Sequence, residues 1–192
     1  MNSVRYIAVT SVFMLILILN GNLVYGQPFK VYGVSDLVRV FEDGHNLSAR
    51  NGSLDLFGIR NEIISGQLVV QAEKNLMGLG AEITDLVDRD TGNNIPAEII
   101  EWNFVGGIPL SENAPNQPLD AVVREAPALF PDYLKTERNM ELSKGRYQAI
   151  WFTIPIPESI PPGRYSGNVK IVAKEGERSL PINITVYPFL LP

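Results

Sequence analysis

Few residues of this chain are suited to nucleophilic or acid–base chemistry. Its 192 residues include no cysteine and one histidine, His45. Without cysteine, a disulfide, a thiolate zinc site and a cysteine nucleophile are all excluded. His45 lies in the sequence Glu-Asp-Gly-His-Asn, a turn-like cluster in which a solvated loop residue is expected. The sequence therefore does not favour a catalytic triad built on histidine.

A pair of carboxyl groups is the other arrangement with catalytic potential. Glycoside hydrolysis uses two carboxyl groups about 5–9.5 Å apart, or one carboxyl group assisted by the substrate. Acidic residues lie close together at Glu42 and Asp43, and again at Asp85, Asp88 and Asp90. All five fall at expected strand ends or turns, where solvated acids are common. We therefore predict no catalytic pair and no enzyme activity for this chain.

The stretch DRDTGNN, residues 88–94, resembles a calcium loop in part, because Asp and Asn supply oxygen ligands. Its glycine does not fall at the sixth position, where an EF-hand loop has one, and the distal glutamate of an EF-hand is absent. A hairpin turn rich in Asp, Gly and Asn explains the same residues without metal. We predict such a turn, with no metal and no cofactor, and keep calcium near Asp88 and Asp90 as the alternative.

Aromatic side chains are the remaining groups with binding potential, because a flat ring can pack on the apolar face of a sugar. Trp151 lies between apolar neighbours in an expected strand, and we predict that it belongs to the core. Trp102 lies between Glu101 and Asn103 and is the better candidate for exposure, while Tyr133 lies in a long polar segment. Trp102 and Tyr133 are therefore candidate carbohydrate contacts.

The overall composition indicates a globular protein. Apolar residues make up 45% of the chain, which suffices for a core in one domain. The net charge is -5 and no basic run is present, which argues against nucleic-acid binding.

The N-terminal segment has the pattern of a signal peptide. Arg5 precedes an apolar run from Ile7 to Leu19, and Gly26 supplies a small residue before the expected cut. A run of about 13 apolar residues is short for a membrane span. We expect residues 1–26 to be removed and the rest to be exported from a bacterium to the periplasm, cell surface or medium, without membrane attachment. An uncleaved N-terminal anchor is the alternative.

The remaining residues 27–192 read as strands separated by turns. Period-two alternation and β-branched residues predict strands in eight segments. About eight short strands without a helical stripe predict an all-β fold, an antiparallel β-sandwich of the immunoglobulin or jelly-roll kind. The predicted strands are 37–41, 54–58, 65–73, 80–88, 95–105, 147–156, 164–174 and 178–187.

One segment departs from this pattern, because residues 108–145 are rich in Pro, Asn, Asp and Glu and predict one long irregular loop. Its apolar residues, Val122, Val123, Leu129, Phe130, Tyr133 and Leu134, give it something to bury and favour an interface.

The proline-rich stretch QAIWFTIPIPESIPPGRYSGNVKI, residues 148–171, predicts a rigid corner between two core strands. Pro155 and Pro157 close the first strand, and Pro161, Pro162 and Gly163 make the reversal. We expect a positive φ at Gly163.

Several segments together resemble a known family. IWFTIPIPESIPPGRYSGNVKI, followed by SLPINITVYPFLLP, resembles the N-terminal β-sandwich domain of glycoside hydrolase family 123 and of related bacterial proteins. The likeness includes GIRNEIISGQLVVQAE and LFPDYL, where Phe130 replaces the usual tyrosine and Tyr133 a proline. In that family the sandwich precedes a catalytic (β/α)8 barrel of the β-N-acetylgalactosaminidase type. This chain has no barrel pattern, and none of its positions matches the family's catalytic pair.

The resemblance implies a non-catalytic accessory domain that supports a glycosidase barrel, its expected partner. The alternatives are a free-standing carbohydrate-binding module, with a glycan as partner, and a surface adhesion or assembly domain that uses a strand edge. Candidate carbohydrate or interface contacts are Trp102, Phe130, Asp132 and Tyr133.

Overall fold

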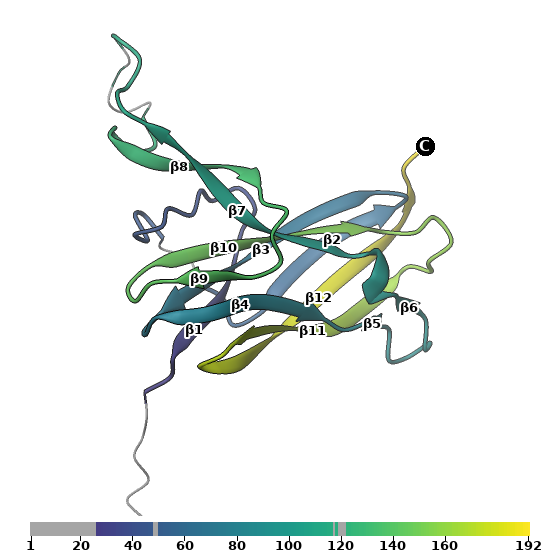
Figure 1. Ribbon diagram of the computed structural model, residues 1–192. Coiled ribbons are helices and arrows are strands. Elements are labelled where there is room, and N and C mark those ends of the chain that lie inside the picture. The colour runs from purple at the N-terminus through teal and green to yellow at the C-terminus, as the bar shows by residue number, and fades with distance from the viewer. Residues whose placement is uncertain (1–25, 48–49, 117, 119–121) are drawn as a thin grey trace, which may run out of the picture.

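The protein is a sandwich of two β-sheets in a computed structural model that describes residues 26–47, 50–116, 118 and 122–192 (Figure 1). The expected signal peptide, residues 1–26, lies outside the described residues except for Gly26. No helix in the described ranges is long and apolar enough to span a bilayer.

The first sheet has five strands, and every neighbouring pair in it is antiparallel. Its order is β1 (Phe29–Val34), β3 (Ile63–Ala72), β10 (Tyr147–Pro155), β7 (Glu101–Leu110) and β8 (Ala128–Leu134).

The second sheet has seven strands. Its main path is β2 (Leu54–Arg60), β12 (Gly176–Leu190), β11 (Gly163–Ala173), β4 (Leu76–Ile83) and β9 (Met140–Leu142). The short strands β5 (Leu86–Val87) and β6 (Asn94–Ile95) pair beside β11, and the 3-10 helix η1 (Ala97–Ile99) follows them. β2 and β12 run parallel, so the sandwich departs from a purely antiparallel one at that edge.

Alternation along the strands builds the main core between the sheets. Ile150 and Phe152 of β10 point inward and are fully buried, as are Val169 and Ile171 of the facing strand β11. Burying apolar surface of this kind is worth about 25 cal/mol per Å². The predicted all-β sandwich is therefore confirmed.

The strand predictions succeed where alternation is regular and fail elsewhere. β3, β10, β11 and β12 lie where they were predicted. The strand predicted over 37–41 is wrong, because these residues form turns and loop. The irregular segment predicted over 108–145 is too long, because β8 and β9 lie within it.

The proline-rich corner is held by a buried tyrosine rather than by a left-handed glycine. Tyr165, near the start of β11, is fully buried and its hydroxyl donates a hydrogen bond of 2.7 Å to the carbonyl of Pro161. The expected positive φ at Gly163 is wrong. Gly163 is required for space, since a Cβ there would collide with the carboxylate of Asp88.

Candidate binding groove on the five-stranded sheet

The outer face of the five-stranded sheet presents side chains that alternate with those of the core. On β10, Ala149 and Trp151 point away from the inward-facing Ile150 and Phe152. Trp151 lies opposite Gln67 of β3 and opposite Asn103 of β7 in the register of the sheet. The half-buried indole of Trp151 therefore lies at the middle of this outer face.

A loop that follows β1 covers part of this face. The buried side chain of Gln67 donates hydrogen bonds of 2.6 and 2.7 Å to the carbonyls of Ser35 and Val38. Val40 and Leu47 of the same loop pack with Val69 and Ala149 in a second apolar cluster, whose members also include Val34. The loop is therefore attached to the sheet by one buried amide and by apolar contacts.

The other boundary of the face is a hairpin of β7 and β8 that projects from the sandwich (Figure 1). The first half of β7 pairs with β10, while residues 105–110 pair with β8. Tyr133 lies opposite Gly106, and a Cβ at Gly106 would collide with the Tyr133 ring. The glycine thus allows the aromatic ring to lie across the neighbouring strand.

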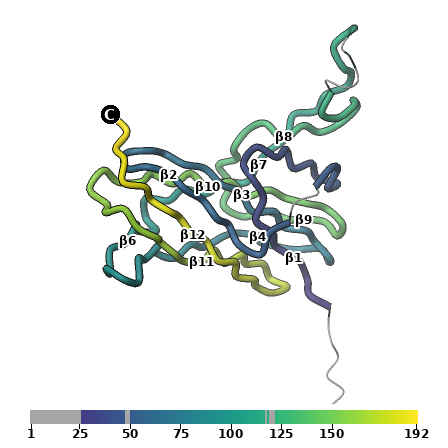
Figure 2. Tube along the Cα trace, turned by 180° about the vertical axis from the view of Figure 1, so that it is seen from behind, coloured from purple at the N-terminus to yellow at the C-terminus, as the bar shows by residue number. Residues whose placement is uncertain are grey.

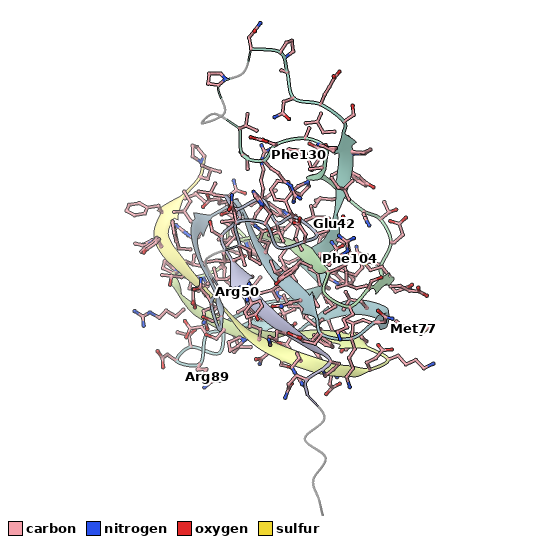
Figure 3. All side chains as sticks on the ribbon, turned by 90° about the vertical axis from the view of Figure 1, so that its left-hand side faces the viewer. Glu42, Arg50, Met77, Arg89, Phe104 and Phe130 are labelled. Atoms are coloured by element: carbon pink, nitrogen blue, oxygen red, sulfur yellow. The ribbon has the colours of Figure 1, made fainter. Side chains whose placement is uncertain are left out.

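Four side chains join the loop to this hairpin, and we call them the clasp: Phe41, Asp43, Arg124 and Phe130. The rings of Phe41 and Phe130 meet edge to face with centroids 5.3 Å apart. The Arg124 guanidinium lies 4.8 Å from the Phe41 centroid and donates hydrogen bonds of 2.7 and 2.6 Å to Asp43. The loop and the hairpin run side by side in Figure 2, and Figure 3 labels Phe130 at the foot of the projecting segment.

The clasp also determines the electrostatics of Asp43. The hydrogen bonds from Arg124 lower the pKa of the Asp43 carboxyl to about 2, with a further contribution from the backbone amide of His45. The pKa of Arg124 is raised by the same pair. His45 itself packs edge to face on Phe41, with centroids 5.7 Å apart. The charges of Asp43 and Arg124 are therefore paired within the clasp.

Between the loop and β8 a groove of about 310 Å³ opens onto the outer face. A second hollow of about 360 Å³ shares Val40, Val105, Pro131 and Ala149 with it, so the two lie side by side. The groove is lined from β3, β7 and β10 by Gln67, Val105, Ala149 and Trp151, from β8 by Pro131, Asp132 and Leu134, and from the loop by Asp36, Val38, Arg39 and Val40.

The two tryptophans lie in the opposite environments to those predicted from the sequence. Both are half-buried, but Trp102 packs against the main core and lies edge to face with Phe104, at a centroid distance of 5.4 Å. The guanidinium of Arg138 covers it 4.9 Å from its ring centroid and donates to its carbonyl oxygen. Trp151, expected in the core, lines the groove instead.

The other candidate residues are brought to the same hairpin but not to one point. Asp132 lines the groove, Phe130 belongs to the clasp, and Tyr133 covers Gly106 beside a different hollow. Sequence reasoning missed Trp151 as a surface residue. Its position directly between two inward-pointing residues, Ile150 and Phe152, was the available signal.

The acidic residues that were considered for catalysis or calcium are engaged in local structure. Asp88 accepts a hydrogen bond of 2.9 Å from the backbone amide of Asp90, and Asp85 accepts one of 2.8 Å from that of Ala97. Glu42 forms an ion pair of 3.0 Å with Arg146. Among the described residues, no group of three or more acidic or histidine side chains is placed to hold a metal ion.

A second surface feature lies at the edge formed by β2 and β12, and we call it the terminal patch: Phe57, Tyr187, Phe189, Leu190 and Leu191. Phe57 is 72% exposed and Phe189 is 64% exposed. The rings of Phe57 and Tyr187 meet at a centroid distance of 6.3 Å. Leu191 is attached to this edge, since its amide donates to the Arg60 carbonyl. Apolar side chains gathered in this way are typical of an interaction surface.

Comparison with known proteins relates most of the chain to one family. The family described as "Glycoside hydrolase 123 N-terminal domain" matches residues 42–173. A family 123 glycoside hydrolase from Clostridium perfringens, solved to study glycolipid glycan hydrolysis, has a TM-score of 0.70 at 14% identity. The match covers 86% of this chain but 28% of that enzyme.

Two other solved structures are more distant. The PapD-like domain 7 of human CEP192 has a TM-score of 0.40 at 10% identity, with 86% of this chain and 87% of that one covered. The CooA pilin subunit of enterotoxigenic Escherichia coli has a TM-score of 0.38 at 14% identity, with 84% and 99% covered. A search of curated proteins finds no significant match.

Proposed function

The chain belongs to the family of glycoside hydrolase 123 N-terminal domains, and we propose that it is a non-catalytic accessory domain which supports a glycosidase (β/α)8 barrel. The sandwich corresponds to little more than a quarter of the Clostridium perfringens enzyme. The remainder of that enzyme leaves room for a catalytic unit, since a barrel of this type takes about 250 residues.

The terminal patch is the observation that carries this proposal. Phe57 of β2 and Tyr187 of β12 project from the outer face of the second sheet, and Phe189 follows Tyr187 on β12. Solvated aromatic rings of this size are costly to leave exposed, and they are enriched at protein interfaces. A barrel that followed Pro192 in the same chain would begin beside these side chains, and a barrel on a neighbouring chain would find the same surface.

The proposal of a supporting role is also consistent with how the acids are used. Asp43, Asp85 and Asp88 each accept hydrogen bonds from a guanidinium or a backbone amide. A carboxyl group engaged in this way stabilises a turn or a loop. Acid–base chemistry on a glycoside needs a carboxyl group within reach of the substrate, with a pKa suited to proton transfer.

Association with the barrel tests the proposal. The full chain is mixed with the barrel encoded in the same or the adjacent reading frame, and complex formation is measured by size-exclusion chromatography and calorimetry. We expect one-to-one association that is lost when Phe57, Tyr187 and Phe189 are changed to serine. The matched control changes Ile108, Leu110 and Leu129 to serine, which are exposed apolar residues of the projecting hairpin.

Two results would contradict the proposal. One is the absence of association with any barrel encoded there. The other is association that survives the serine changes in the terminal patch and disappears with those in the hairpin, which would move the interface to residues 108–145. Export is tested separately, since cell fractionation of the source bacterium is expected to recover a chain that begins at Gln27 outside the cytoplasm.

A further inference from the structure

We propose that the groove between the loop after β1 and the projecting hairpin binds a saccharide, with the indole of Trp151 as its floor and Asp36, Arg39 and Asp132 as its polar rim. This site is separate from the terminal patch, because it lies on the outer face of the other sheet. It therefore adds a binding function that does not depend on the accessory role.

The strands beneath the groove decide against a peptide ligand. β3 is paired with β1 and β10, β10 with β3 and β7, and β7 with β10 and β8. Backbone groups of these three strands are used in ladders on both sides, and the edge strand β8, which pairs with β7 alone, contains Pro131, which has no N–H to offer an added strand. Recognition on the floor of this groove must therefore use side chains, as sugar recognition does.

The side chains of the groove match the two surfaces of a pyranose. One face of a pyranose is apolar C–H surface, and the half-buried indole of Trp151 offers a flat apolar partner for it. The ring edge of a sugar carries hydroxyls that both donate and accept hydrogen bonds. Asp36 and Asp132 are acceptors and Arg39 is a donor, so the exposed rim supplies both kinds of partner.

The rim groups are also available. The side chains of Asp132 and Arg39 make no hydrogen bond or ion pair within the part of the chain that the structure describes. Asp36 accepts one long hydrogen bond, of 3.3 Å, from the Ser35 hydroxyl. The rim carries two carboxylates and one guanidinium, so its net charge is negative. A negatively charged rim repels phosphate and sulfate groups and therefore favours a neutral ligand. A neutral saccharide fits this balance better than a nucleotide or an anionic lipid.

The walls of the groove are held in place before a ligand arrives. Gln67 fixes the loop that carries Asp36 and Arg39 through the carbonyls of Ser35 and Val38. The clasp fixes the same loop to the hairpin that carries Asp132. A site whose walls are fixed in advance loses less entropy on binding. The adjoining hollow, which contains Glu42, Arg146 and Tyr147, gives space for a further sugar unit.

Tryptophan fluorescence of the full chain tests the proposal, because the chain has two tryptophans. N-acetylgalactosamine, galactose, N-acetylglucosamine, glucose and lactose are titrated into the protein. At least one of them is expected to change the emission of the wild type and of Trp102→Phe, in which Trp151 is the sole reporter. Trp151→Phe is expected to give no change, and saturation-transfer NMR then measures binding without the indole.

Variants of the rim locate the site. Asp132→Ala and Arg39→Met change exposed side chains, so folding is expected to survive, and each should weaken the sugar by about tenfold or more. Trp151→Ala should abolish binding in a chain with unchanged circular dichroism. Asp90→Ala, at an exposed acid in the distant β5–β6 turn, is the matched control and should bind as the wild type does.

The outcomes separate this inference from the accessory role. Absence of binding by all five sugars, or wild-type affinity in both Asp132→Ala and Arg39→Met, overturns the saccharide site. Binding of an extended peptide without any sugar also overturns it. If no saccharide binds but the rim variants still associate with the barrel, the saccharide site is rejected and the accessory role is retained. The serine changes in the terminal patch should leave sugar binding unchanged.

Discussion

Arg124 and Asp43, 81 positions apart in the chain, form a bidentate ion pair with hydrogen bonds of 2.7 and 2.6 Å. The pair joins the connection between β7 and β8 to the loop that follows β1. Two parallel N–H···O bonds fix orientation as well as distance. The relative position of the two walls of the groove therefore depends on this contact and on the neighbouring rings of Phe41 and Phe130.

Removing the Arg124 guanidinium should raise the pKa of Asp43 toward its ordinary value. In Arg124→Gln, we expect the pKa of Asp43 to rise from about 2 toward the ordinary value of 3.8, because the hydrogen bonds from Arg124 are the main cause of the depression. Carboxyl chemical shifts followed by NMR during an acid titration measure it. Lys170→Gln, which breaks an exposed ion pair with Glu177 in the second sheet, is the control and should leave the Asp43 pKa unchanged.

The same pair predicts how stability responds to acid. The folded-state pKa of Asp43 lies below its unfolded value, so its contribution is present above about pH 4 and is lost as the pH falls toward about 2. The side chains are 21% and 44% exposed, which keeps the contribution below about 1 kcal/mol. Urea unfolding at a series of pH values should show a shallower loss in this range for Arg124→Gln than for the wild type. Parallel curves for the two proteins would contradict it.

Loss of one hydroxyl should weaken the proline-rich corner. Tyr165→Phe keeps the buried ring and leaves the carbonyl of Pro161 without its donor, so the free energy of unfolding should fall by about 1–2 kcal/mol. Chemical denaturation measures the change. Tyr187→Phe, at a ring that is 46% exposed, is the matched control and should have almost no effect. Equal stabilities of the two variants would mean that the bond to Pro161 contributes nothing.

A methyl group should not be tolerated at the start of β11. In Gly163→Ala, the new Cβ would overlap the carboxylate of Asp88, which is buried and holds the amide of Asp90. We expect a loss of about 1–3 kcal/mol in unfolding free energy, because the backbone or the Asp88 turn must move. Gly52→Ala is the control, since open space surrounds that position. If both alanine variants unfold at the same denaturant concentration, the steric explanation is wrong.

Sequence alone predicts the strands in which apolar residues recur at every second position. β10 and β11 alternate through Ile150, Phe152, Val169 and Ile171, so pattern alone locates them. The same alternation places Trp151 on the opposite face, but a run of apolar residues does not reveal that both faces are partly covered. Trp102 lies on the same face of β7 as Phe104, which is two positions away. This position in the strand, and not its polar neighbours in sequence, determines that Trp102 packs against the core.

The remaining failures have physical causes that lie outside the local sequence. Residues 37–41 alternate like a strand, yet the buried Val40 and the partly buried Val38 pack on the outer face of the sheet without joining it, and Phe41 is buried in the clasp. β8 contains Pro131 and carries exposed side chains, so it looks irregular until its pairing with β7 is known. The groove arises where these two segments meet the sheet residues around Trp151, and neither segment identifies it alone.

The parallel pairing of β2 with β12 has a consequence for how the protein is made. Asn183 donates a hydrogen bond of 2.7 Å to Asp55, which the ribosome produces 128 residues earlier. β2 therefore waits without its partner while most of the chain is being synthesised, with its edge open to misassociation. A nascent chain released before Gly176 lacks β12 and should remain a substrate for chaperones and proteases.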